Sequence, residues 1–382
     1  MIYNRHSFES HRTIALSASF SPNDNDDALA EHHIIISHTD PSADFDTQLA
    51  SIESTATEML ALLGSGTDVV LKRYFLSDVA NQAHRIERSG NCCLSAIGQP
   101  PLNGSKVALW MYAITNADIR RNQAGLTEFK HNAYTHIFAG GITTGHNNSK
   151  EETTSILNEY AAELNELNCT LKDNCVRTWF FVRDIDINYS GVVEGRNMVF
   201  RANDLTTDTH FIASTGIGGI ASSRSSLVTM DAYSIHGLKE DQITYLHAPE
   251  MMNATHEYGV AFERGTAINY GDRRHVIISG TASIDNKGQI MHQGNVKEQA
   301  LRMLKNVESL LAKAGCGWND TAHIIVYLRD IADTEVVRDI MRAHLPNQPM
   351  IIVEAPVCRP GWLIEMECMA ICRQSAPQYD KF

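Results

Sequence analysis

The 382-residue sequence contains no apolar run that approaches the roughly 20 residues of a membrane-spanning helix. Residues 1–20 also lack the apolar stretch of a signal peptide. We therefore expect a soluble, cytoplasmic protein with no membrane partner. Hydrophobic residues make up 43% of the chain and charged residues 20%, a balance that allows a sizeable core without disulfides or metal ions to hold it.

Patterns of metal ligands and paired thiols are missing as well. The eight cysteines follow no zinc-ligand spacing, and Cys92 and Cys93 are adjacent, an arrangement that rarely forms a bridge. The 17 histidines include no H-E-x-x-H pair. The sequence thus predicts free thiols in a reducing compartment and no metal site.

The chain also lacks an excess of positive charge. The net charge of −13 argues against binding along a phosphate backbone, so we expect no nucleic-acid partner. A local group of arginines could still bind a small anionic molecule. The glycine runs at 139–141 and 216–219 match neither the dinucleotide-binding pattern nor the P-loop, so no cofactor is predicted.

What the chain does contain is one unit in three diverged copies. Each copy has an amphipathic helix, a short turn and an apolar strand that ends in aspartate, and the strands share the echoes YFLSD, FFVRD and VYLRD. These echoes in register favour a true repeat over ordinary alternation of helices and strands. The helices are expected at 45–64, 154–168 and 296–315, the strands after them at 68–78, 174–184 and 320–330, the strands before them at 32–40, 135–145 and 275–285, and the closing strands at 106–114, 226–235 and 362–371.

These repeats predict the architecture. A helix that crosses over a sheet makes a right-handed strand–helix–strand unit. We expect three fused α/β repeats that form a pseudo-trimer, with repeats at 1–118, 119–240 and 241–382. Because the three units could cover each other's sheet faces and edges, we predict a monomer or at most a weak dimer.

The third repeat resembles the Rid (YjgF/UK114) proteins in its ISG strand with a following aspartate, its helix, VYLRD and the closing IEMECMAI. Over residues 174–371 the chain is similar to the chorismatases, enzymes built from fused Rid-like units. The first 100 residues match only as a degenerate repeat. The pieces that carry the similarity are Arg177–Trp179, Gly195–Arg196, Ala213–Gly219, Ser279–Ser283, Val326–Arg329, Cys358–Pro360 and Leu363–Glu365.

This resemblance implies a chorismate-mutase-like α/β fold for each repeat and a cofactor-free hydrolase or lyase that acts on chorismate and releases pyruvate. It leaves open whether the second product is a dihydroxycyclohexadiene acid or a hydroxybenzoate. A Rid-type deaminase of enamines or imines is the alternative enzyme, but it should carry an arginine shortly before the final strand pair, where this chain has Met350. A non-catalytic Rid-like protein that binds small molecules is the third alternative.

Hydrolysis of an enol ether needs a proton donor, and Glu365 is the candidate acid. Glu365 and Glu367 are two apart on a predicted strand, so they point to one face among apolar neighbours. Burial and a like-charged neighbour both raise a carboxyl pKa. The other repeats carry Thr229 and Ala108 at the position of Glu365, so only the third copy keeps this acid. A solvent-facing strand with two exposed carboxylates is the alternative.

The carboxylates of chorismate would need arginine, which binds them in a bidentate manner. The candidates are Arg196 and Arg329, with Arg177 next, although each could equally be an ordinary surface arginine. Tyr189 could supply a hydroxyl group or be structural. Cys358, seven residues before Glu365, is expected to line the same pocket and shape the choice of product, because no histidine stands near it to make it a nucleophile. A buried structural cysteine is the alternative.

Overall fold

The computed structural model describes residues 1–22, 29–88, 90–223 and 225–382. Three six-stranded sheets carry the same strand order, in which the last strand of each set of six lies between its third and fourth strands. In every sheet one strand pair at an edge is parallel, and the inner strand of that pair is antiparallel to its other neighbour. This repetition confirms the three fused α/β repeats.

The first sheet has the order β1-β2-β3-β6-β4-β5. Its helix α1 is capped by the side chain of Asp44 and turns Ile52, Ala56 and Met59 inward at helical spacing. The elements are β1 (Ile2–Phe8), β2 (Thr13–Phe20), β3 (Ala30–His38), α1 (Phe45–Leu63), β4 (Thr67–Leu76), α2 (Val79–Gln82), η1 (Ala83–Arg85), β5 (Cys93–Gly98) and β6 (Val107–Thr115).

The second sheet has the order β11-β10-β12-β9-β8-β7. It carries two long helices, of which α3 matches a predicted helix and α5 does not. The elements are β7 (Ile119–Arg121), β8 (Thr127–His131), β9 (Tyr134–Ile142), α3 (Ser149–Glu166), α4 (Leu171–Asn174), β10 (Cys175–Val182), α5 (Ile185–Ala202), β11 (Ala213–Gly218) and β12 (Val228–His236).

The third sheet has the order β13-β14-β15-β18-β16-β17. Its helix α6 ends before Gly315, which adopts a positive φ of 70° that glycine accommodates without strain. The elements are η2 (Glu240–Gln242), β13 (Ile243–Tyr245), η3 (Thr255–Tyr258), β14 (Gly265–Asn269), β15 (Arg273–Ala282), α6 (Val296–Lys313), η4 (Trp318–Asp320), β16 (Thr321–Leu328), η5 (Ile331–Asp333), α7 (Thr334–His344), β17 (Met350–Glu354) and β18 (Ile364–Arg373).

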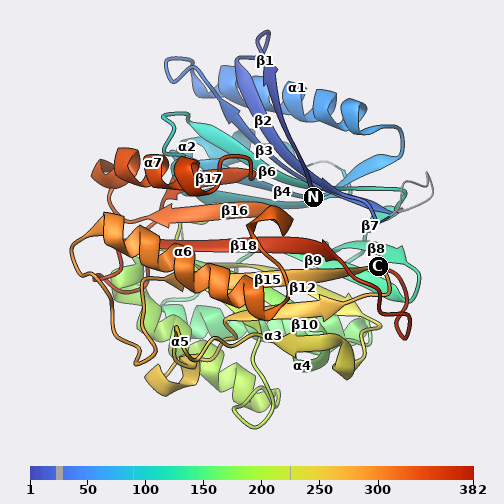
Figure 1. Ribbon diagram of the computed structural model, residues 1–382, viewed down its shortest axis with the longest axis vertical. Helices are drawn as coiled ribbons and strands as arrows, with labels where there is room; N and C mark the ends of the chain where they lie inside the picture. Colours follow the sequence, from blue (N-terminus) through green and yellow to red (C-terminus); the bar gives the residue numbers. More distant parts are fainter. Residues whose placement is uncertain (23–28, 89, 224) are drawn as a thin grey trace.

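The sheets pack on one another around a common core, and the long helices lie outside them, with α1 at one end of the molecule and α3 and α5 at the other (Figure 1). Buried ion pairs join each repeat to the next within this core: Arg73 with Asp231, Arg177 with Glu367, and Arg273 with Glu31.

The strands of each sheet lie within one predicted repeat. The exact repeat boundaries and the monomeric state stay predictions.

Four of the buried histidines on β3, β9 and β16 have lowered pKa values. Burial lowers the pKa of His33 to about 3 and that of His32 to about 4, and it also lowers the pKa of His136 and of His323. His32 and His33 are therefore neutral in the folded protein at pH 5, whereas an unfolded chain protonates them near pH 6.5.

We expect a His33→Gln variant to lose less stability on acidification than the unchanged protein does. Between pH 7 and pH 5 the unfolded state binds more protons at His33 than the folded state, so the free energy of unfolding falls as the pH falls, by about 2 kcal/mol for this one group. Urea denaturation at both pH values measures the difference. Equal pH dependence in the variant and the parent would contradict the burial of a neutral His33.

Candidate active site

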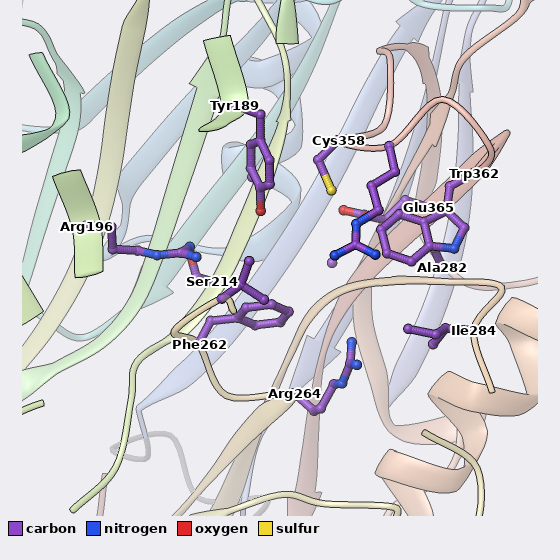
Figure 2. Close-up of a pocket in the computed structure, with 14 residues that line it drawn as sticks. Tyr189, Arg196, Ser214, Phe262, Arg264, Ala282, Ile284, Cys358, Trp362 and Glu365 are labelled. Carbon is purple, nitrogen blue, oxygen red and sulfur yellow. The ribbon is translucent and has the colours of Figure 1, made fainter. Parts of the chain in front are cut away.

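One pocket collects most of the residues that the sequence singles out. It lies between the second and third repeats, where α5 and β11 face β15 and β18 (Figure 2). Its wall is partly apolar and carries three arginines and one carboxyl group. The lining residues are Tyr189, Arg196, Ser214, Gly216, Val260, Phe262, Arg264, Gly280, Ala282, Ile284, Cys358, Arg359, Trp362 and Glu365.

Glu365 lies on the central strand β18, between Ala282 of β15 and Tyr327 of β16 in the register of the sheet. Its side chain is only 5% exposed, so the alternative of a solvent-facing strand is wrong. Space for the carboxyl group comes from Gly280, since a Cβ atom there would collide with Oε1 of Glu365. A side chain at position 280 would displace the acid from the pocket.

Burial raises the pKa of Glu365 to about 8, and the negative charge of Glu367 acts in the same direction. Arg264 and Arg177 oppose this shift without cancelling it. At neutral pH the Glu365 carboxyl group is therefore mostly protonated, the state that a general acid requires.

Glu367, two residues after Glu365 on β18, does not line the pocket. Its carboxylate accepts hydrogen bonds from Trp179 Nε1 at 2.6 Å and from Arg177 Nη2 at 2.8 Å. Arg177 also donates to Thr215 Oγ1, which accepts a second hydrogen bond from the backbone N–H of Gly280. Arg177, predicted as a substrate ligand, instead supports the strand beneath Glu365 and does not line the pocket.

Arg196 projects from α5 into the pocket from the side opposite to Glu365 (Figure 2). It is 1% exposed, and within the described part of the chain its Nε and Nη2 atoms have no hydrogen-bond partner. A buried guanidinium with open donors is costly unless an anion completes it. This arrangement favours a negatively charged group of a ligand beside Arg196.

Tyr189 and Cys358 lie near each other in the pocket wall, with the hydroxyl and sulfur atoms turned toward the other lining residues (Figure 2). Gly216 makes room for the tyrosine ring, since a Cβ atom there would lie 2.8 Å from Cε2 of Tyr189. Burial raises the pKa of the Cys358 thiol to about 12, and Glu365 adds to the shift. Cys358 is therefore a neutral wall residue and no thiolate nucleophile at neutral pH.

Arg329 is placed outside this pocket. Both of its terminal nitrogens bind Asp186 at 2.9 Å, and Nη2 also donates to the carbonyl of Val357. These contacts tie the end of β16 to the start of α5 across the repeat boundary. The expectation that Arg329 holds a substrate carboxylate has no support from this geometry.

Among the lining residues that were not predicted as site residues, four carry a charged or aromatic side chain: Arg264, Arg359, Phe262 and Trp362. Arg264 is buried just before β14 and donates to the carbonyl of Asn253, and Arg359 stacks 5.1 Å above the Trp362 ring. A sequence signal for Arg359 exists, because it lies inside the 358–360 motif. Arg264 lies in no motif, and only the pairing of β14 with β15 brings it close to Glu365.

The described residues contain no group of three or more metal-binding side chains. None of the helices in that part of the chain is long and apolar enough to cross a membrane.

Residues 263–372, in the third repeat, match the family model described as endoribonuclease L-PSP. The 2-iminobutanoate/2-iminopropanoate deaminase of Homo sapiens is 32% identical over 100 residues, which are 26% of this chain and 73% of that enzyme. The chain belongs to the Rid family. A RutC family protein of Pyrococcus abyssi is 29% identical over 97 residues, 25% of this Rid chain and 76% of its own length.

The whole Rid-like architecture also has a counterpart. A crystal structure of a chorismatase has a TM-score of 0.64 and 18% identity, and it covers 79% of this chain and 92% of its own. The fold is therefore that of a chorismatase, three Rid-like repeats fused in one chain.

Proposed function

We propose that this protein is a cofactor-free enzyme that acts on chorismate and releases pyruvate. The observation that carries the proposal is the pairing, in one pocket, of a protonated carboxyl group on Glu365 with a buried guanidinium on Arg196 that has open donors. Chorismate matches both features, since it carries an enol ether to protonate and two carboxylates to bind. The chorismatase fold supports the same assignment.

Glu365 would deliver its proton to the methylene carbon of the enolpyruvyl group. The resulting oxocarbenium ion takes up water, and the water proton returns to the Glu365 carboxylate. The hemiketal then collapses to pyruvate and a dihydroxycyclohexadiene acid, so one chorismate and one water give two products. Loss of water from the ring would give a hydroxybenzoate instead. Cys358 lines the pocket together with Glu365, and this supports a role for it in that choice.

The arginines would divide the two carboxylates between them. Arg196 approaches from one side, while Arg264 and Arg359 come from the third repeat. The free space between them is about 30 Å³, room for about two water molecules. Binding of a six-membered ring therefore requires wall side chains to move, as happens in active sites that close on their substrate.

A Rid-type deaminase should carry an arginine that binds the substrate carboxylate, and this chain has none at either position where that arginine would stand, 350 or 214. Met350 lies on β17 and lines a different cleft. The position that corresponds to Met350 beside Glu365 is Ser214, because β11 and β17 pair in the same register with β10 and β16. Neither position therefore offers the guanidinium with which a Rid deaminase should bind its substrate carboxylate. The acidic chain likewise gives no support to the nuclease activity in the family's description.

Purified protein incubated with chorismate should release pyruvate in equal amount to the chorismate consumed, measured with lactate dehydrogenase and NADH. The rate should survive exhaustive treatment with EDTA, since no metal takes part in the proposed chemistry. A 2-iminobutanoate substrate serves as the competing assay. Ammonia release from the imine without pyruvate release from chorismate would replace this proposal with the deaminase.

A further inference from the structure

A second and larger cleft lies between the first and third repeats. Its free space is about 620 Å³, within the range of small-molecule sites. One wall is formed by α7 and β17, and the other by β1, β2 and β3, which lie beside them in Figure 1. The residues that line this cleft and those that line the candidate active site are two separate sets.

This cleft is the pseudo-symmetric copy of the active-site pocket. Arg342 on α7 lies 12 residues after Asp330, as Arg196 on α5 lies 12 after Asp184 (342 − 330 = 196 − 184). Each aspartate ends the repeated strand motif of its own unit. The two arginines are therefore equivalent, and each lines the space in front of its helix.

The strands beside these helices correspond as well. Met350 and Ile352 of β17 occupy the positions that Ser214 and Gly216 hold on β11, in matching registers with β16 and β10. All four residues line their respective spaces. One wall of the active-site pocket is thus repeated, with apolar side chains in place of the small ones.

The opposite walls correspond in the same way. The registers of the paired strands place Ile14 where Phe262 stands and Leu16 where Arg264 stands. The acid is gone, since Ala108 takes the place of Glu365 in the closing strand. This cleft therefore keeps the shape of a site and one of its arginines but has lost the proton donor.

Formal charge in this second cleft is of one sign. Its lining includes Arg5, Arg338 and Arg342 and no aspartate or glutamate among the described residues, in a chain whose net charge is −13. Arg338 is partly engaged by Glu335 and the carbonyl of Leu102. Arg5 and Arg342 are exposed at the rim. The cleft is therefore a local positive site on an acidic protein.

The floor between these arginines is apolar. The side chains of Ile14, Leu16 and Ile352 form it, and each is only half-buried. An apolar ligand surface that covers half-buried aliphatic side chains stabilises the complex by about 25 cal/mol per Å² of apolar surface removed from water. Positive groups at the rim and apolar groups at the floor together match a ligand with one anionic end and one apolar end.

We propose that this cleft is a second, non-catalytic binding site for a small carboxylate with an apolar ring or chain. The carboxylate binds the guanidinium groups of Arg342 and Arg5 through charge-assisted hydrogen bonds. The apolar body covers the half-buried isoleucine and leucine side chains and removes them from water. The site holds a ligand without changing it, because the acid position is alanine.

The probe is 4-fluorobenzoate, followed by fluorine NMR of the full-length protein. Binding is compared in Arg196→Met, where the active site has lost the arginine that corresponds to Arg342, and in Arg196→Met/Arg342→Met. The second variant should bind at least about tenfold more weakly, the loss expected for removal of a charge-assisted hydrogen bond. Equal affinity in the two proteins would overturn the proposal.

Two further variants distinguish loss of ligand binding in this cleft from misfolding and from an effect on catalysis. Ile352→Glu, which adds a negative charge to the floor of the cleft, should weaken binding of the probe as Arg342→Met does. Arg342→Met alone should leave turnover of chorismate unchanged, and a lost turnover would show that the cleft belongs to the active site. Light scattering tests the other occupant, since a dimer dispersed by Arg342→Met would mean that a second copy fills the cleft.

Discussion

A Glu365→Gln variant should release pyruvate from chorismate about 10²–10⁴ times more slowly than the unchanged protein, the range that general acid catalysis contributes. Glutamine keeps the shape of the side chain and can still donate a hydrogen bond, but it has no proton to transfer. The substrate should bind nearly as before, since the arginines and not the acid hold its carboxylates. Single-turnover and steady-state assays separate the two effects.

The pH dependence gives a second readout for the same residue. With a pKa of about 8, Glu365 loses its proton as the pH rises, so kcat should fall on the alkaline side of pH 8 and that limb should vanish in Glu365→Gln. Glu367→Gln removes the neighbouring charge that helps to raise this pKa, and the limb should move to lower pH. A near wild-type rate in Glu365→Gln would refute the mechanism.

The threefold architecture can be predicted from the sequence because its signal is repeated. Each helix and strand of the repeated unit is present in three copies, so a pattern that is weak in one copy is supported by its counterparts. The alignment of Glu365 with Thr229 and Ala108 comes from the same source, and the registers of the three sheets reproduce it. The restriction of this acid to one repeat is therefore visible in the sequence alone.

The two predicted arginines that do not line the pocket are held by contacts between repeats. Arg329 ends a strand, which favours a cleft, but Asp186 from the second repeat neutralises it. Arg177 lies in a family-like motif, but Glu367 from the third repeat pairs with it. Sequence patterns miss Arg264 because its neighbours in space are distant in sequence. Local patterns predict which side chains leave a strand on which face, while the partner that meets them is set by the packing of the repeats.

We expect Arg196 to bind the substrate at a cost to the stability of the ligand-free protein. An Arg196→Met variant keeps much of the buried volume but removes a guanidinium whose Nε and Nη2 atoms have no partner within the described chain. Without ligand, the variant should be more stable than the unchanged protein, by about 1–3 kcal/mol, because the desolvation cost of the open donors disappears. Urea denaturation of the two proteins measures this difference. Active sites commonly carry such costs for the sake of binding.

The same substitution should raise the KM for chorismate by about 10²-fold, since loss of one partner of a buried charge pair costs about 2–5 kcal/mol. The effect on kcat should be much smaller, because Arg196 holds the substrate while Glu365 supplies the proton. Arg342→Met is the matched control: it changes the equivalent position on α7, where the side chain is exposed, and should alter neither the KM nor the urea midpoint. A variant at Arg196 that is less stable and keeps its KM would show that the guanidinium is a structural residue, and the carboxylate of the substrate would then have to be sought at Arg264 and Arg359.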